Sequence, residues 1–146
     1  TQFCYAELID RVVAFVDDIA ITNSELEDNY IEMTKLSPDI KKIDVLNTMI
    51  NRTLLLREAR KLRLEAATKD ETIKEYIELK LRTFIRITDE DIKKFYGENR
   101  KEFGNADIED VREKIEEYFI EKEVNVRLKK HIEELRAKAY IKIQLE

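Results

Sequence analysis

Residues 107–138 read DIEDVREKIEEYFIEKEVNVRLKKHIEELRAK, and this stretch decides the fold class of the chain. It contains neither Gly nor Pro, the residues that most disfavour a helix interior. Its apolar side chains recur at helical intervals amid dense charge: Ile108, Val111, Ile115, Phe119, Val126, Ile132 and Leu135. The pattern predicts one helix about 48 Å long, at about 1.5 Å per residue. Because that length exceeds the core of a small domain, we expect another element, a partner or a second copy of the chain to cover part of its apolar face.

The composition of the whole chain agrees with a helical fold. Its 146 residues are 43% apolar, which is enough to form the core of one ordinary domain. Charged residues make up 40%, while Gly numbers 2 and Pro 1, and this mixture disfavours turn-rich sheets. An all-β fold is excluded.

Charge and rare residues limit the kinds of ligand. The net charge of −5 arises from 32 acidic and 27 basic side chains that are interspersed, so we expect no nucleic-acid partner. No run approaches the roughly 20 apolar residues of a membrane span, so we expect no membrane insertion. The single cysteine, Cys4, and the single histidine, His131, give no zinc cluster or catalytic pair. We therefore expect no metal, no cofactor and no catalytic residues, and we interpret His131 as a surface or interface side chain.

Short strands are predicted at both ends of the chain. Residues 9–16 are rich in β-formers and precede a turn at Asp17-Asp18, after which 19–21 could complete a short hairpin. At the other end, residues 140–145 alternate apolar and polar side chains. Since separate strands form no stable sheet, we expect the two ends to pair. The predicted fold is mostly α, with helices closed by a small sheet of N-terminal and C-terminal strands.

Three helix starts are marked by capping patterns, in which a threonine hydroxyl accepts a bond from the backbone three residues later. They lie at 22–25, 68–71 and 88–91. The first predicted helix has a stripe of Leu26, Tyr30 and Met33 and ends at 37–39. A second, central helix is predicted over 44–62, a third from 68 to near Arg86, and a short fourth after Thr88 with Ile92, Phe95 and Tyr96 on one face.

Four stretches resemble the SurA and PrsA-like periplasmic foldases, in the order of that family. They are 9–26 (IDRVVAFV, then IAITNSEL after the turn), 45–59 (VLNTMINRTLLLREA), 88–96 (TDEDIKKFY) and 135–143 (LRAKAYIKI). One departure is Asp17-Asp18, where the family has a Gly-containing turn. A second is the parvulin-type prolyl isomerase domain, which would lie between Phe103 and Asp107 and is replaced by Gly104-Asn105-Ala106.

The resemblance implies a single SurA N-terminal-type chaperone domain over 9–146, preceded by residues 1–8. Cys4 and Ala6 are spaced like the positions before a signal-peptidase cut, so 1–8 is either a signal-peptide remnant or an ordinary flexible N-terminus. The implied function is a periplasmic holdase, a chaperone that binds unfolded exported or outer-membrane polypeptides without ATP. Without the parvulin domain it implies no isomerase activity.

Aromatic and Met side chains are the candidate client-binding residues, because Met adapts its shape and Tyr offers a flat face. They are Tyr30, Met33, Met49, Tyr76, Phe84, Phe95, Tyr96 and Phe119. The same residues at helical spacing are also typical of a core. A different hypothesis is a structural dimerisation module in which the long helix pairs with its twin, or in which helices or terminal strands are exchanged.

Overall fold

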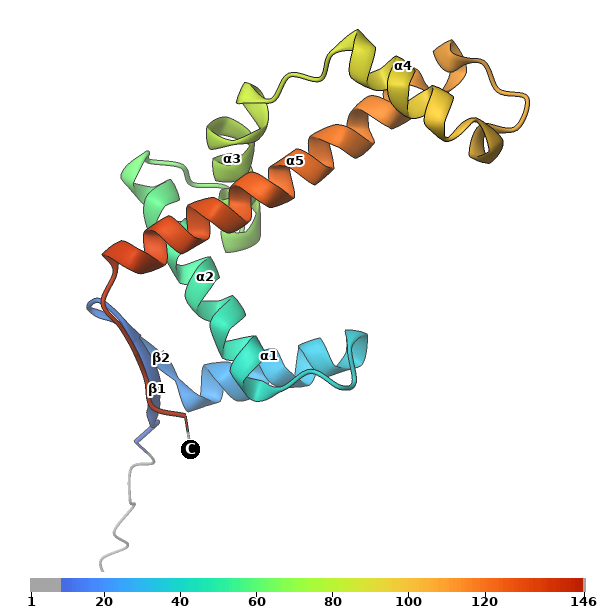
Figure 1. Ribbon diagram of the computed structural model, residues 1–146. Helices are drawn as coiled ribbons and strands as arrows, with labels where there is room; N and C mark the ends of the chain where they lie inside the picture. Colours follow the sequence, from blue (N-terminus) through green and yellow to red (C-terminus); the bar gives the residue numbers. More distant parts are fainter. Residues whose placement is uncertain (1–8, 146) are drawn as a thin grey trace, which may run out of the picture. The chain divides into compact units, whose positions relative to one another are not determined.

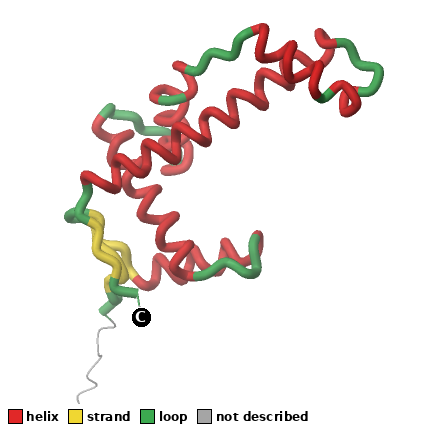
Figure 2. Tube along the Cα trace, viewed as in Figure 1, coloured by secondary structure: helices red, strands yellow, loops and turns green. Residues whose placement is uncertain are grey.

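The computed structural model describes residues 9–145, and most of that part of the chain is helical (Figures 1 and 2). The elements in chain order are β1 (Val12–Val16), β2 (Ile19–Thr22), α1 (Asn23–Leu36), α2 (Lys42–Lys61), α3 (Lys69–Lys80), η1 (Arg82–Phe84), α4 (Asp89–Glu98), η2 (Arg100–Phe103), α5 (Ile108–Lys138) and β3 (Ile141–Ile143). The predicted class, mostly α with a small sheet from both chain ends, is confirmed. The expectation for residues 1–8 lies outside the described residues.

The chain divides into two compact units. The terminal unit contains residues up to Glu58 and from Ile132 onward, and the central unit is Ala59–His131. The boundaries fall inside α2 and α5, so each of these helices contributes residues to both units. Each unit is described separately below.

A three-stranded antiparallel sheet joins the chain ends in the terminal unit. The strand order is β2-β1-β3, so the strand nearest the C-terminus pairs with β1 rather than with β2. Val16 pairs with Ile141 and Ala14 with Ile143. Beyond β3, the Gln144 backbone N–H donates to the Val13 carbonyl at 2.8 Å. The predicted pairing of the two ends is therefore confirmed.

The turn at Asp17 ties the hairpin to two other parts of the terminal unit. Asp17 has a φ of 52°, a left-handed conformation that aspartate tolerates better than most residues. Its backbone N–H donates to the Tyr140 carbonyl, and its Oδ1 accepts from the Tyr140 N–H, both at 2.8 Å. Its other carboxylate oxygen pairs with Arg57 of α2. Asp17 thus combines a positive φ with side-chain bonds to Tyr140 and Arg57 that a glycine at this position could not make.

The core of the terminal unit forms where α1 and α2 meet the sheet. Thr22 and Glu25 complete the predicted capping box of α1, and Ser37 ends the helix as expected. The fully buried side chains of this unit are Val13, Ala14, Val16, Leu26, Val45, Leu46, Ile50 and Leu54. Half of these lie on α2, so α2 supplies the main apolar face of this core, as its wide apolar side predicts. Arg136 near the end of α5 donates to Asn47 and Asn51 of α2, at 2.7 and 2.5 Å.

The central unit contains α3, α4 and most of α5. The Thr68 hydroxyl caps α3, but this helix ends at Lys80 rather than near Arg86 as predicted. A 3₁₀ turn, η1, follows, from which Arg82 reaches α5 and beyond which Ile85 is buried. Tertiary contacts here override a helical pattern in the sequence. The predicted helix starts at Thr88 and near Asp107 are confirmed by α4, with a capping box, and by α5.

We expect Asp17→Ala to lower the free energy of unfolding by about 1–3 kcal/mol. The change removes a hydrogen-bond acceptor, an ion pair and a residue suited to positive φ. Asp17→Asn retains the acceptor and the backbone preference, so we expect a loss of about 1 kcal/mol or less.

Urea unfolding followed by circular dichroism measures both losses. Asp18→Ala is the matched control, since Asp18 is the exposed neighbour in the same turn. Equal effects of the Asp17→Ala and Asp18→Ala variants would contradict the assigned role of Asp17.

Candidate functional site

The eight candidate binding residues are divided between the two units. Tyr30, Met33 and Met49 are half-buried in the terminal unit. The central unit holds Tyr76, Phe84, Phe95, Tyr96 and Phe119. Phe84 is 66% exposed and is the one member of the eight that is largely open to solvent.

An aromatic cluster joins α4, η2 and α5 in the central unit. The Phe95 ring centroid lies 5.3 Å from that of Phe119, 5.3 Å from that of Tyr118 and 6.2 Å from that of Phe103. The rings of Phe95, Phe103 and Phe119 pack on a buried group of Ile92, Val111 and Ile115. Such ring pairs stabilise beyond their buried area, by about 0.5–1.5 kcal/mol each. Phe95 and Phe119 therefore hold this end of the unit together.

Tyr96 is fixed in the same cluster by polar contacts. Its hydroxyl donates to the Ala106 carbonyl at 2.7 Å, and its ring lies 5.5 Å from that of Phe103. The Arg100 guanidinium lies 4.7 Å from the Tyr96 ring centroid and also donates to Ala106. These bonds secure the turn around Gly104, whose φ of 57° suits glycine.

Tyr118 is a surface residue that the sequence argument missed. It touches Phe95 and Phe119 yet is 49% exposed. The predicted stripe of α5 passes through Ile115 and Phe119, which places Tyr118 to one side of it. Phe119 lies on the stripe and is next to Tyr118 in the sequence, and this adjacency is the signal that could have indicated a second aromatic side chain beside the stripe.

Tyr76 and His131 form an interior pair between α3 and α5. Tyr76 is 3% exposed, and a hydrogen bond of 2.8 Å joins its hydroxyl to Nε2 of His131. The ring centroids are 5.8 Å apart. The sequence argument expected His131 to be a surface or interface side chain, and the structure shows it half-buried at the contact between α3 and α5.

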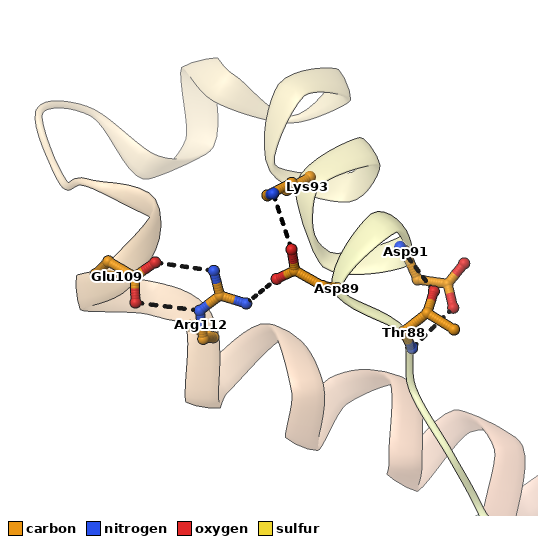
Figure 3. Close-up of polar contacts among 6 residues, drawn as sticks. All are labelled: Thr88, Asp89, Asp91, Lys93, Glu109 and Arg112. Atoms are coloured by element: carbon orange, nitrogen blue, oxygen red, sulfur yellow. Dashed lines mark hydrogen bonds and ion pairs between the residues drawn. The ribbon is translucent and has the colours of Figure 1, made fainter.

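An ionic network connects α4 to the first turns of α5 (Figure 3). Arg112 lies between Glu109, which accepts from Nη2 at 2.8 Å, and Asp89, which accepts from Nη1. Lys93 pairs with the other oxygen of Asp89 at 2.8 Å. The pKa of Asp89 is lowered by Lys93 and then by Arg112, and that of Glu109 by Arg112. Beside this network, the hydrogen bond from Thr88 lowers the pKa of Asp91.

A second arginine anchors the turn that presents Phe84. Arg82 donates to Glu117 at 2.6 Å and to Glu121, and its Nε lies 3.5 Å from Glu78. The two α5 carboxylates raise the pKa of Arg82, and Arg82 lowers the pKa of Glu121. Phe84 is thus an exposed ring on a turn fixed to α5.

Among residues 9–145, no group of His, Cys, Asp and Glu side chains is arranged to hold a metal ion. No helix in that part of the chain is both long enough and apolar enough to span a bilayer. The exposed aromatic side chains can bind apolar groups, and the ionic networks fix the helices beside them.

Comparison with known proteins gives no family assignment. No protein-family model matches the chain, and no curated protein matches it at a significant level.

We expect the central unit to lose stability as the pH falls below the ordinary carboxyl values, which are 3.8 for Asp and 4.5 for Glu. The folded-state pKa values of Asp89, Asp91, Glu109 and Glu121 are lowered, so the unfolded chain binds more protons in this range. Their stabilising effect is present above the ordinary values and is lost as the pH falls through the folded values.

Arg112→Gln should make the acid limb of a plot of urea midpoint against pH shallower, chiefly through Glu109, because Lys93 still lowers the pKa of Asp89. Arg60→Gln, at an exposed arginine of the same unit, is the control and should leave the slope unchanged. An Arg112→Gln profile parallel to the original would show that the network does not couple protonation to folding.

Proposed function

We propose that this chain is a periplasmic chaperone of the SurA type, which holds unfolded exported or outer-membrane polypeptides and has no prolyl isomerase activity. The observation that carries the proposal is the order of elements. The hairpin of β1 and β2, the start of α1, most of α2 and α4, the end of α5 and the closing strand β3 lie at the residues that resemble the family. A single chaperone domain over 9–146 and a periplasmic location belong to the same proposal.

Exposed apolar side chains on ordered elements support the holdase function. Phe84 stands on the anchored η1 turn, and Leu36 is 90% exposed at the end of α1. A holdase needs apolar surface that remains open while the rest of the protein stays folded. In contrast, Phe95, Tyr96 and Phe119 are engaged in the cluster described above, so they support the surface rather than form its open part.

The purified chain should suppress aggregation of an unfolded outer-membrane protein when present at several-fold excess. Phe84→Ser should raise the excess that is required by about twofold or more, because it removes an exposed apolar contact. Thr83→Ser is the matched control, since it alters the neighbouring residue and retains a hydroxyl for the Glu78 carbonyl. Light scattering measures both.

Failure of the unmodified chain to suppress scattering would overturn the holdase proposal. Acceleration of proline-limited refolding at catalytic concentrations would overturn the absence of isomerase activity. Equal effects of the two variants would remove Phe84 from the binding surface.

A second candidate function, a dimerisation module, is favoured by α5. Tyr118 and Val126, which is 58% exposed, lie two turns apart on this helix within the central unit. A twin helix could cover them. The two functions are compatible, because a dimer could share a client surface.

The dimerisation hypothesis predicts that sedimentation equilibrium at high micromolar concentration gives twice the monomer mass, and that Val126→Glu shifts the equilibrium to monomer. Leu62→Glu, at another exposed apolar residue of the central unit, should leave the mass unchanged. A monomer at all concentrations would exclude this function.

A further inference from the structure

β3 lies at one edge of the three-stranded sheet, and the bonds at its two ends show which of its backbone groups point away from β1. Just before β3, the Tyr140 carbonyl accepts from the Asp17 N–H at 2.8 Å. Just after it, the Gln144 N–H donates to the Val13 carbonyl, also at 2.8 Å. Bonding and non-bonding residues alternate along an antiparallel strand, so the residues that bond β1 are 140, 142 and 144.

The two isoleucines of β3 have their backbone groups on the open side of the strand. Ile141 and Ile143 alternate with the bonding residues, so the N–H and C=O of each point away from β1. Within residues 9–145 no strand lies beyond β3, since the sheet order is β2-β1-β3. Lys142 and Ile143 are exposed, so this edge is open to solvent. It presents two donors and two acceptors in the pattern of a strand that lacks a neighbour.

The opposite edge of the sheet, formed by β2, offers fewer open groups. Thr22 pairs with Val12 and has its N–H on the open side, but that N–H donates to the Glu25 carboxylate at 2.8 Å. The capping box of α1 thus closes this end of β2 and leaves only Ala20 of that strand with both backbone groups turned outward and available. β3 is therefore the better site for an added strand.

The side chains of β3 define which strand would fit there. Ile141 lies directly opposite Val16, and Ile143 lies directly opposite Ala14. Because Val16 and Ala14 are fully buried, the two isoleucines belong to the core face of the sheet, yet Ile143 is 39% exposed. Lys142 points to the other face, is exposed, and has no ion pair in the described part of the chain. An added strand would meet apolar side chains on one face and a positive charge on the other.

We propose that the β3 edge, defined by Ile141, Lys142 and Ile143, binds an extended polypeptide segment as an added antiparallel strand. Apolar residues of the segment lie opposite the two isoleucines, and an acidic residue lies opposite Lys142. This rests on the proposed chaperone function and specifies how a client is held. The main-chain bonds require a strand, and the side chains select alternating apolar and polar residues. That alternation is typical of outer-membrane barrel strands.

The charge of Lys142 disfavours a second copy of the chain at this edge. Two β3 strands that paired through both isoleucines would be related by a two-fold axis, with Ile141 of each opposite Ile143 of the other. The two Lys142 side chains would then lie directly opposite each other, and like charges at such positions are destabilising. A lysine on an edge strand in this way prevents pairing of identical edges. An acidic client residue makes an opposite-charge pair instead.

The main test uses the unmodified full chain and fluorescein-labelled peptides with the core Thr-Val-Glu-Val-Thr. In the proposed pairing, the N–H groups of both peptide valines donate to the carbonyls of Ile141 and Ile143. N-methylation of both valines should therefore weaken binding by about tenfold or more. N-methylation of the glutamate and the second threonine, whose N–H groups point away from β3, is the matched control and should have little effect. Fluorescence anisotropy measures each affinity.

A change of charge tests the position opposite Lys142. A peptide with lysine in place of the central glutamate should bind about threefold more weakly, and added salt should reduce this difference. Lys142→Glu should reverse the preference. Lys130→Glu, at an exposed lysine of the central unit, is the control and should leave the preference unchanged.

Ile143→Pro tests the edge from the side of the protein. Because this N–H points outward, proline removes a donor to the peptide without removing a bond to β1, and edge strands tolerate proline at such positions. Peptide binding should weaken by about fivefold or more, whereas Ile143→Val, which retains the N–H, should bind nearly as the original chain does. Circular dichroism checks the fold of both variants. If Ile143→Pro does not fold, the N-methylated peptides, which need no variant, decide the matter.

The outcomes distinguish this inference from the proposed function. Equal effects of the two methylation patterns overturn the β3 edge as the site and leave the holdase function standing. A dimer that Ile143→Pro converts to a monomer also overturns it, because a second copy then occupies the edge. Suppression of aggregation without binding of the peptide has the same meaning. Absence of both binding and suppression overturns the two proposals together.

Discussion

The pairing of β1 with β3 is the interaction on which the terminal unit depends. A two-stranded hairpin is marginal in water, and β3 supplies the third strand from the other end of the chain. The hydrogen bond from the Gln144 backbone N–H to the Val13 carbonyl joins residues that are far apart in sequence. The entropic cost of closing a loop grows only slowly with its length, so pairing β1 with β3 costs little more free energy than closing a shorter loop would. Contacts between residues so far apart in sequence do, however, slow folding. The terminal unit can form only after the whole central segment has been synthesised.

The same closure determines the role of Asp17. Because the turn after β1 meets the junction between α5 and β3, a residue there has to adopt a positive φ and also hold the incoming chain. Aspartate does both, through its bonds to Tyr140 and its pair with Arg57. In the sequence, Asp17-Asp18 is only a departure from the Gly-containing turn of the family that the chain resembles. The structure shows instead a junction of β1, α2 and the chain's C-terminal segment.

Local signals in the sequence were sufficient to predict most elements. Thr22, Thr68 and Thr88 mark helix starts because a hydroxyl cap depends on residues only three apart. The absence of Gly and Pro predicts α5, and period-two alternation predicts β3. In contrast, α3 ends at Lys80 because of Arg82 and Ile85, whose contacts are tertiary and leave no local pattern.

The solvent exposure of individual aromatic and apolar side chains could not be predicted from the sequence. Phe84 and Tyr76 both follow a helical pattern, yet one lies in solvent and the other is buried against His131. Only tertiary packing distinguishes them. The same applies to Leu36 at the end of α1, which is 90% exposed although Leu26 of the same helix is fully buried. The eight candidate binding residues, chosen from the sequence as aromatic or Met side chains, therefore include both residues that pack inside a unit and residues that are exposed to solvent.

The exposed apolar side chains are spread over both units. This distribution determines how a holdase of this kind would bind its clients. One exposed leucine or phenylalanine contributes at most about 1.5–3 kcal/mol when it is fully buried, which gives only weak binding alone. An unfolded client, however, carries many apolar segments on one chain. Once one segment is bound, the others are held at high effective concentration, so several weak surfaces together retain a client that none retains singly. Weak individual contacts also allow release without ATP, since each dissociates quickly. Scattered exposure on two folded units is thus consistent with binding that is broad in sequence and reversible.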